Sequence, residues 1–82
     1  MGKGEINMAI SFILIGAAPA HEVYNKLSTV MEIIELHPLF GEYDLIAKIE
    51  AEDFEKLGNI IVEKIRSIDG VIDTITLTGT TF

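Results

Sequence analysis

The chain has 82 residues, of which 49 % are hydrophobic, and a formal net charge of −7 at pH 7. This length suits a single domain, and the negative charge disfavours direct contact with nucleic acid, because phosphates repel an acidic surface. The absence of cysteine excludes disulfides, thiolate metal sites and cysteine nucleophiles. The longest apolar run, residues 8–18, is too short to span a bilayer. We therefore expect one cytoplasmic domain over residues 1–82, in which residues 1–6 form a short polar lead.

The first half of the chain predicts a strand, a helix and a second strand. Residues 7–17, NMAISFILIGA, are apolar on both alternating faces, which is typical of a central strand covered on both sides. Pro19 stands where a helix begins, and the apolar residues of segment 20–30 recur at helical spacing. Residues 31–40 are rich in Ile and Leu, and Pro38 predicts an edge strand or a strand end, because proline cannot donate to a ladder.

The second half predicts a strand, a helix and a final strand. Residues 43–51, YDLIAKIEA, alternate in polarity as a strand does. Asp53 is a suitable N-cap for a helix over residues 54–68, whose apolar side would comprise Phe54, Leu57, Ile61, Ile65 and Ile68. Residues 71–80, VIDTITLTGT, alternate again, and we expect Ile72, Thr74, Thr76 and Thr78 on one face and Val71, Ile75 and Leu77 on the face toward the helices.

The element order predicts an α+β fold of the ferredoxin-like βαββαβ kind. Such a domain has a four-stranded antiparallel sheet with two helices on one face. The other face would carry Ile46, the threonines and one side of the first strand, and would leave a partly apolar surface. Because a patch of this kind usually marks an interface, we expect a sheet-to-sheet dimer, a dimeric α+β barrel, or a layer supplied by a partner.

The sequence shows no pattern typical of catalysis, metal binding or a cofactor. His21 and His37 are the only histidines, and their spacing matches no metal-ligand motif. The serines lack a nucleophile elbow, and the chain has no glycine-rich phosphate loop. We therefore expect no catalytic residues, no cofactor and no enzyme activity.

The segment Gly41-Glu42-Tyr43-Asp44 precedes the third predicted strand and has two interpretations. It is compatible with a hairpin turn, in which glycine and the acids are common. It is also compatible with a site for a small zwitterion, because carboxylates bind an ammonium group and backbone N–H groups around a glycine bind a carboxylate. Thr76 and Thr78 could add neutral hydroxyl groups to such a site.

The stretch from Met8 to Thr80 resembles the effector-binding domain, or RAM domain, of the Lrp/AsnC family of transcriptional regulators. The resemblance is carried by Gly41-Glu42-Tyr43-Asp44 before the third strand, by the helix end from Ile65 to Val71, and by the threonines of the last strand. Glu42 stands where the family often has aspartate. Only seven residues precede the first strand, whereas the usual family member has a helix-turn-helix domain there, so we expect a stand-alone module with no helix-turn-helix domain.

The resemblance implies a regulatory module that binds an amino acid or a related small metabolite. It implies homodimers that assemble into a ring, with an octamer favoured, and a ligand site at the seam between dimers. The ligand-binding residues implied are Gly41, Glu42, Tyr43, Asp44, Thr76 and Thr78. A full-length regulator of the family is a further expected partner, whereas direct contact with nucleic acid or a membrane is not expected.

Three alternatives to this function remain open. The chain could serve purely in oligomerisation or in mixed assemblies with full-length regulators. It could be an enzyme of the dimeric α+β barrel kind, which shares the topology, although aliphatic residues fill the positions expected to face the helices. An ACT-type amino-acid-binding domain also shares the topology, but joins its sheets side by side.

Overall fold

The computed structural model describes residues 8–78, and the expectations for residues 1–7, 79 and 80 lie outside the described residues. The elements follow the order β1 (Ala9–Ala17), α1 (Ala20–Leu27), β2 (Ile33–Pro38), β3 (Leu45–Ala51), α2 (Phe54–Ile60), the π-helix η1 (Ile61–Ile65) and β4 (Val71–Thr78). This order confirms the expected βαββαβ fold.

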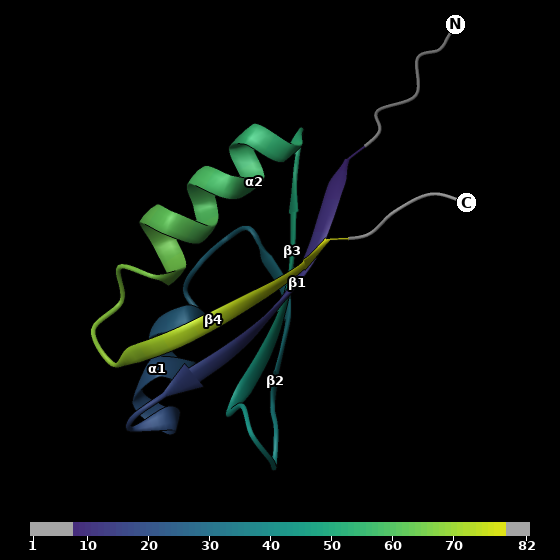
Figure 1. Ribbon diagram of the computed structural model, residues 1–82. Helices are drawn as coiled ribbons and strands as arrows, with labels where there is room; N and C mark the ends of the chain where they lie inside the picture. Colours follow the sequence, from purple (N-terminus) through teal and green to yellow (C-terminus); the bar gives the residue numbers. More distant parts are fainter. Residues whose placement is uncertain (1–7, 79–82) are drawn as a thin grey trace, which may run out of the picture.

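The four strands form one antiparallel sheet in the order β2-β3-β1-β4. The two helices lie on the same side of this sheet (Figure 1). The doubly apolar strand β1 is central, as predicted, and β2 is an edge strand that ends at Pro38. None of the helices within residues 8–78 has the length and apolar character that crossing a membrane requires.

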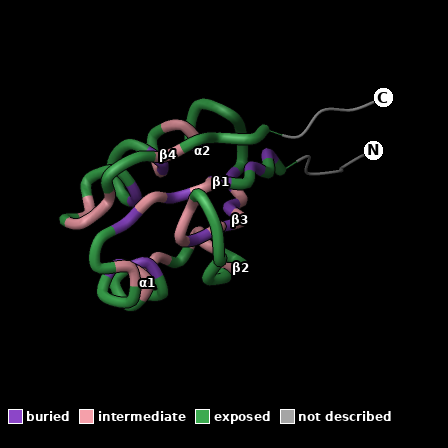
Figure 2. The backbone as a smooth tube through the Cα atoms, turned by 60° about the horizontal axis from the view of Figure 1, so that its bottom comes forward, coloured by how far each residue is buried: buried purple, intermediate pink, exposed green. Residues whose placement is uncertain are grey.

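The hydrophobic core lies between the helices and the two central strands. Every second residue of β1 and β3 is buried, and the buried positions of both strands face each other in the register (Figure 2). The helices cover them with Val23 and Leu27 from α1 and with Leu57, Ile61 and Ile65 from α2 and η1. Ser11 is the buried polar residue of this layer, and its Oγ donates to the Leu77 carbonyl at 3.2 Å.

The second helix departs from the single α-helix expected over residues 54–68. Asp53 caps it as predicted, since its Oδ1 accepts from the Lys56 N–H at 2.8 Å. Beyond Ile60 the helix widens into the π-helix η1, where the Arg66 N–H donates to the Ile61 carbonyl. Both Ile61 and Ile65 are buried in the core.

Phe54 was expected in the core but is 59 % exposed. It is the first residue of α2, directly after the N-cap, where the chain is still turning away from β3. The apolar side of the helix that packs on the sheet therefore begins with Leu57, which is buried.

The faces assigned to β4 were wrong from Thr74 onward, whereas Val71 packs against the core as expected. Ile75 and Leu77 lie opposite Leu14 and Phe12, on the face away from the helices. The three threonines Thr74, Thr76 and Thr78 lie opposite Ile15, Ile13 and Ser11, on the helix side. The cause is a register shift, because Val71 and Asp73 pair with the consecutive residues Ala17 and Gly16, which leaves Ile72 as an extra residue. One extra residue reverses the alternation for the rest of the strand.

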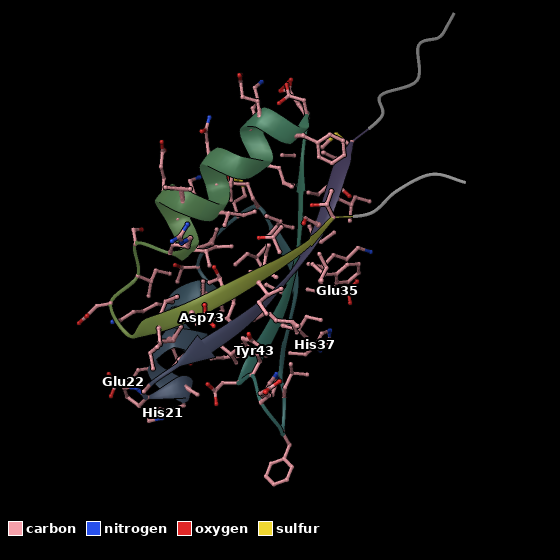
Figure 3. All side chains as sticks on the ribbon, viewed as in Figure 1. His21, Glu22, Glu35, His37, Tyr43 and Asp73 are labelled. Atoms are coloured by element: carbon pink, nitrogen blue, oxygen red, sulfur yellow. The ribbon has the colours of Figure 1, made fainter. Side chains whose placement is uncertain are left out.

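The face of the sheet away from the helices has an apolar part and a charged part. The apolar part is formed by β1 and β4, where Ile10, Phe12, Ile75 and Leu77 are between 36 and 49 % exposed. The charged part lies toward β2, where Glu35 accepts from Lys48 at 3.5 Å and contacts His37 at 3.2 Å (Figure 3). The Lys48 Nζ also lies 5.7 Å from the centre of the Phe12 ring. We refer to the apolar part as the open-face patch.

Candidate functional site

The loop between β2 and β3 is held in place by backbone hydrogen bonds at its base. The Leu39 N–H donates to the Asp44 carbonyl at 2.8 Å, which closes the loop. The Asp44 N–H donates to the Ile15 carbonyl at 2.9 Å, which joins the loop to the end of β1. Residues 40–42 between these bonds are exposed to solvent, whereas Tyr43 is half-buried. The predicted ligand loop is therefore fixed to the central strand of the sheet at one end.

The Asp44 carboxylate also has a structural partner. Its Oδ2 accepts from the Ala17 N–H at 2.8 Å. Ala17 is the last residue of β1, at the point where the register of β1 against β4 shifts. Asp44 thus accepts a hydrogen bond from a backbone N–H at the irregular end of the central strand. A buried or half-buried N–H needs such an acceptor.

Tyr43 and Asp73 join the loop to the start of β4. The Tyr43 hydroxyl donates to Asp73 Oδ2 at 3.4 Å, and the two side chains lie near each other in Figure 3. Partial burial raises the pKa of the Tyr43 phenol, and the negative charges of Asp73 and Glu42 together with the hydrogen bond to Asp73 raise it further. The phenol therefore stays protonated and able to donate a hydrogen bond at neutral pH.

A shallow pocket of about 470 Å³ lies between this loop and the start of β4. Its lining comprises Gly16, Ala17, Glu42, Tyr43, Asp44, Ile72, Asp73 and Ile75. Three carboxylates and one phenol are the polar side chains of this lining, so the local electrostatics favour a cationic group such as an ammonium. We refer to this hollow as the acidic pocket.

The structure brings together only part of the predicted site. Glu42, Tyr43 and Asp44 line the acidic pocket. Gly41 belongs to the same loop, and among the described residues no atom lies within 4 Å of the position that a Cβ on Gly41 would take. Thr76 borders a different hollow, beside Ile61 and Arg66 on the helix side of β4. The Thr78 hydroxyl lies 3.4 Å from Ser11 Oγ on that same side. Within one chain, the threonines and the loop do not share a pocket.

Sequence reasoning missed Asp73 as a member of this site. Asp73 is the single charged residue of β4, which is the signal that could have found it. The strict alternation assumed for the strand gave no reason to place the Asp73 side chain near the loop. The extra residue at Ile72 sets its direction, because Asp73 then lies opposite Gly16 on the face away from the helices.

The described residues offer no metal site. Residues 8–78 contain no group of three or more His, Asp or Glu side chains arranged to hold a metal ion. His37 Nε2 lies 3.2 Å from Glu35 Oε1 on the sheet surface, and His21 lies on the first turn of α1 (Figure 3).

Comparison with known proteins gives the family of the chain. The sequence model of the Lrp/AsnC ligand binding domain matches residues 10–78. An uncharacterised HTH-type transcriptional regulator of Pyrococcus horikoshii, PH1916, is 35 % identical over 72 residues, which are 82 % of this chain and 48 % of the regulator. The chain therefore spans about half the length of the curated relatives it matches.

Solved structures show the same fold. The crystal structure of FFRP-DM1 has a TM-score of 0.81 at 35 % identity, over 88 % of this chain and 99 % of that one. The transcriptional regulator NMB0573 from Neisseria meningitidis, solved as a complex with L-Met, has a TM-score of 0.77 at 19 % identity, over 89 % of this chain and 50 % of that one. The matched segment corresponds to a ligand-binding domain, as expected. The chain belongs to the Lrp/AsnC ligand-binding domain family.

Proposed function

We propose that this chain is an effector-binding module that takes up an amino acid or a related small metabolite at the loop Gly41–Asp44. The observation that carries the proposal is the acidic pocket, where Glu42, Asp44 and Asp73 surround one hollow beside the loop. Membership of a ligand-binding domain family supports it. The match to FFRP-DM1, which covers 99 % of that chain, supports the treatment of this segment as one domain.

The chemistry of the acidic pocket suits the ammonium group of an α-amino acid. Carboxylates and an ammonium form charge-assisted hydrogen bonds, which are stronger than neutral ones. Glu42 and Asp73 are the carboxylates assigned to this task, because Asp44 already accepts from the Ala17 N–H. The backbone N–H groups near Gly41 are the donors for the ligand carboxylate, because the single hydrogen of the Tyr43 hydroxyl is already donated to Asp73.

Assembly would complete the site. Thr76 and Thr78 lie on an edge strand, so a neighbouring chain could present them to the loop of this one. We propose a dimer formed through the open-face patch and a ring of dimers, of which an octamer is the favoured form, with the ligand at the seam. A ligand that binds one arrangement better than another shifts the equilibrium between them.

The test combines calorimetry and light scattering. Each of the twenty amino acids is titrated into the protein, and the mass is measured by size-exclusion light scattering with and without the ligands that bind. We expect at least one amino acid to bind, to raise the melting temperature and to change the mass. Glu42→Gln should weaken binding, while Glu55→Gln, an exposed acid on α2 outside the pocket, should not. Absence of binding by all twenty, with an unchanged mass, would contradict the proposal.

A second candidate function is assembly without a ligand. The observation that favours it is the open-face patch, which needs a covering layer whether or not a ligand is bound. In that case the partner is a second copy or a longer regulator of the same family. A fixed mass in every titration, together with co-elution of the chain with such a regulator, would favour this candidate over the first.

A further inference from the structure

We propose that the outer edge of β4 is a contact surface for a second copy of this chain, which adds its own β4 antiparallel to this edge. The contact joins two four-stranded sheets side by side, with Thr76 opposite the same residue of the second copy on a twofold axis. This inference goes beyond the proposed function, because it involves no ligand and no residue of the loop Gly41–Asp44.

The two edge strands of the sheet, β2 and β4, differ in how they discourage pairing. β2 contains Glu35 and ends at Pro38. A charge or a proline at a sheet edge opposes the addition of a further strand, because the charge resists burial and proline lacks an N–H. Residues 74–78 of β4, Thr-Ile-Thr-Leu-Thr, contain neither a charge nor a proline. The chain therefore protects one edge and leaves the other open to pairing.

The outer side of residues 74–78 has no partner strand within the described chain. Among residues 8–78, β4 pairs with β1 alone. An edge strand presents its remaining backbone N–H and C=O groups to solvent, where another extended strand can bind them. The side chains of this segment are β-branched or aliphatic, as in strands that pair on both sides. Backbone and side chains of this edge thus suit a further strand.

The segment is complementary to itself when two copies pair about Thr76. In this register Thr74 of each copy lies opposite Thr78 of the other, on the helix side of the sheet, where pairs of threonines are favourable. Ile75 of each copy lies opposite Leu77 of the other, on the open face. Asp73 lies outside the five paired residues, so the two Asp73 carboxylates stay far apart. No charged side chain is buried in the contact.

Charge and the open-face patch indicate that the partner is a second copy. The chain has a net charge of −7, so two copies approach each other best through a segment without charge, such as residues 74–78. Pairing about Thr76 also brings the Ile75 and Leu77 side chains of both copies together, which joins two open-face patches into one continuous apolar surface. The edge contact leaves that surface free for a sheet-to-sheet contact, so both contacts fit in one assembly.

Cysteine cross-linking tests the contact and its register, because the chain has no cysteine of its own. Directly opposite residues of antiparallel strands have Cα atoms about 4.5–5.5 Å apart, a distance that a disulfide spans. Thr76→Cys should therefore give a disulfide-linked dimer under mild oxidation. Thr74→Cys is the matched control on the same strand and face, because its two Cα atoms would be about 14 Å apart. A mixture of Thr74→Cys and Thr78→Cys should again give a cross-linked dimer.

Charged variants test the contact without a covalent link. The double variant Thr74→Lys with Thr78→Lys places like charges opposite each other at both ends of the paired segment, and should weaken the edge contact about tenfold or more. The double variant Thr74→Lys with Thr78→Glu places opposite charges there and should form the contact. Size-exclusion light scattering without added amino acids measures the mass of each assembly, and melting temperatures check that each variant keeps the fold.

The outcomes separate this inference from the proposed function. Cross-linking of Thr76→Cys but not of Thr74→Cys, with a smaller assembly for the double-lysine variant than for the lysine–glutamate variant, supports the edge contact. Equal cross-linking of the two cysteine variants, or equal masses of the two charged variants, overturns it. Neither result depends on whether an amino acid binds, so a failure of the proposed function leaves the edge contact standing, and the reverse holds as well.

Discussion

The backbone conformation and the surroundings of Gly70 leave no room for a side chain. Its φ of +102° belongs to a region that side chains rarely adopt, and a Cβ there would lie 2.7 Å from Cγ2 of the buried Val23. Gly70→Ala should therefore lower the free energy of unfolding by about 2 kcal/mol or more, through strain and overpacking together. Urea unfolding followed by circular dichroism measures the change.

Gly58 provides the control for this prediction. It lies within α2, and among the described residues nothing stands within 4 Å of where its Cβ would be. Gly58→Ala should raise the free energy of unfolding by about 0.5–1 kcal/mol, because alanine is the better helix former. If both alanine variants had the same effect, the close contact at Gly70 would not be the cause.

Tyr43 and Asp73 allow the electrostatics of the acidic pocket to be measured. The native state holds the Tyr43 proton more tightly than the unfolded chain, because its pKa is raised above 10.0. The stability that this contributes is present below pH 10 and is lost as the pH rises through the folded pKa. Asp73→Asn removes one negative charge and should lower the pKa of Tyr43, although burial, the largest cause of the rise, remains.

Absorbance of the phenolate measures this pKa directly. The chain has two tyrosines, so the titration is carried out in a Tyr24→Phe background, where Tyr43 is the only one. Glu50→Gln serves as the control, because Glu50 is an acid on β3 outside the acidic pocket. A titration midpoint that stays the same after Asp73→Asn would contradict the contact between the two side chains.

At the residue scale, sequence predicted the loop but not the whole pocket. The run Gly41-Glu42-Tyr43-Asp44 is contiguous, so its position before β3 was readable, and the structure places three of its members on one hollow. Asp73 comes from a strand that is distant in sequence, and its direction depends on an irregular register. A pattern confined to one segment cannot supply that information.

Asp53 controls the start of α2 and gives the prediction at the scale of elements. Its Oδ1 accepts from the Lys56 N–H at 2.8 Å, which satisfies one of the free donors at the helix end. Asp53→Ala should lower the free energy of unfolding by about 1 kcal/mol, the usual contribution of an N-cap. Asp53→Ser, which keeps an acceptor at this position, should retain most of the stability. Thermal or urea unfolding of the two variants makes the comparison, and equal losses would contradict the cap.

Strands and helices were predicted correctly where apolar residues recur at one constant spacing, and incorrectly where that spacing is interrupted. β1 and β3 alternate without interruption through the core; β1 was correctly predicted as central, and β3 was assigned to the correct faces. β4 contains an extra residue at Ile72, so an alternation counted from Val71 assigns Ile75 and Leu77 to the wrong face. Likewise, helical periodicity alone predicted a continuous α-helix through η1, because Ile61 and Ile65 are buried at a spacing that also fits an α-helix.

At the scale of the whole molecule, the open-face patch is the surface that a single chain leaves uncovered. An apolar patch on this face was predicted in spite of the wrong face assignment in β4. Its residues differ from the expected ones, because Ile75 and Leu77 lie there in place of the threonines. The corrected patch is more apolar than the one expected from the sequence. It therefore strengthens the physical reason to propose a sheet-to-sheet dimer, because burial of apolar surface drives association.

Leu77→Asp tests that dimer. Leu77 is 49 % exposed and lies opposite Phe12, so the change places a carboxylate at the centre of the apolar strands while the core on the helix side is untouched. Burying an unpaired charge between two sheets is costly, and the chain already carries a net charge of −7, so the dissociation constant of the dimer should rise by at least about a hundredfold. Sedimentation velocity over a range of concentrations measures the shift from dimer to monomer.

The control for this prediction is Val62→Asp, which also replaces an exposed aliphatic residue by an acid. Val62 is 55 % exposed but belongs to η1, on the helix side of the molecule. It should leave the mass of the assembly unchanged. If Leu77→Asp remained a dimer at low concentration while Val62→Asp dissociated, the interface would lie on the helices and not on the sheet. In that case the neighbouring chain would contact the helices, and the position of the acidic pocket relative to that chain would follow from the helix-side interface.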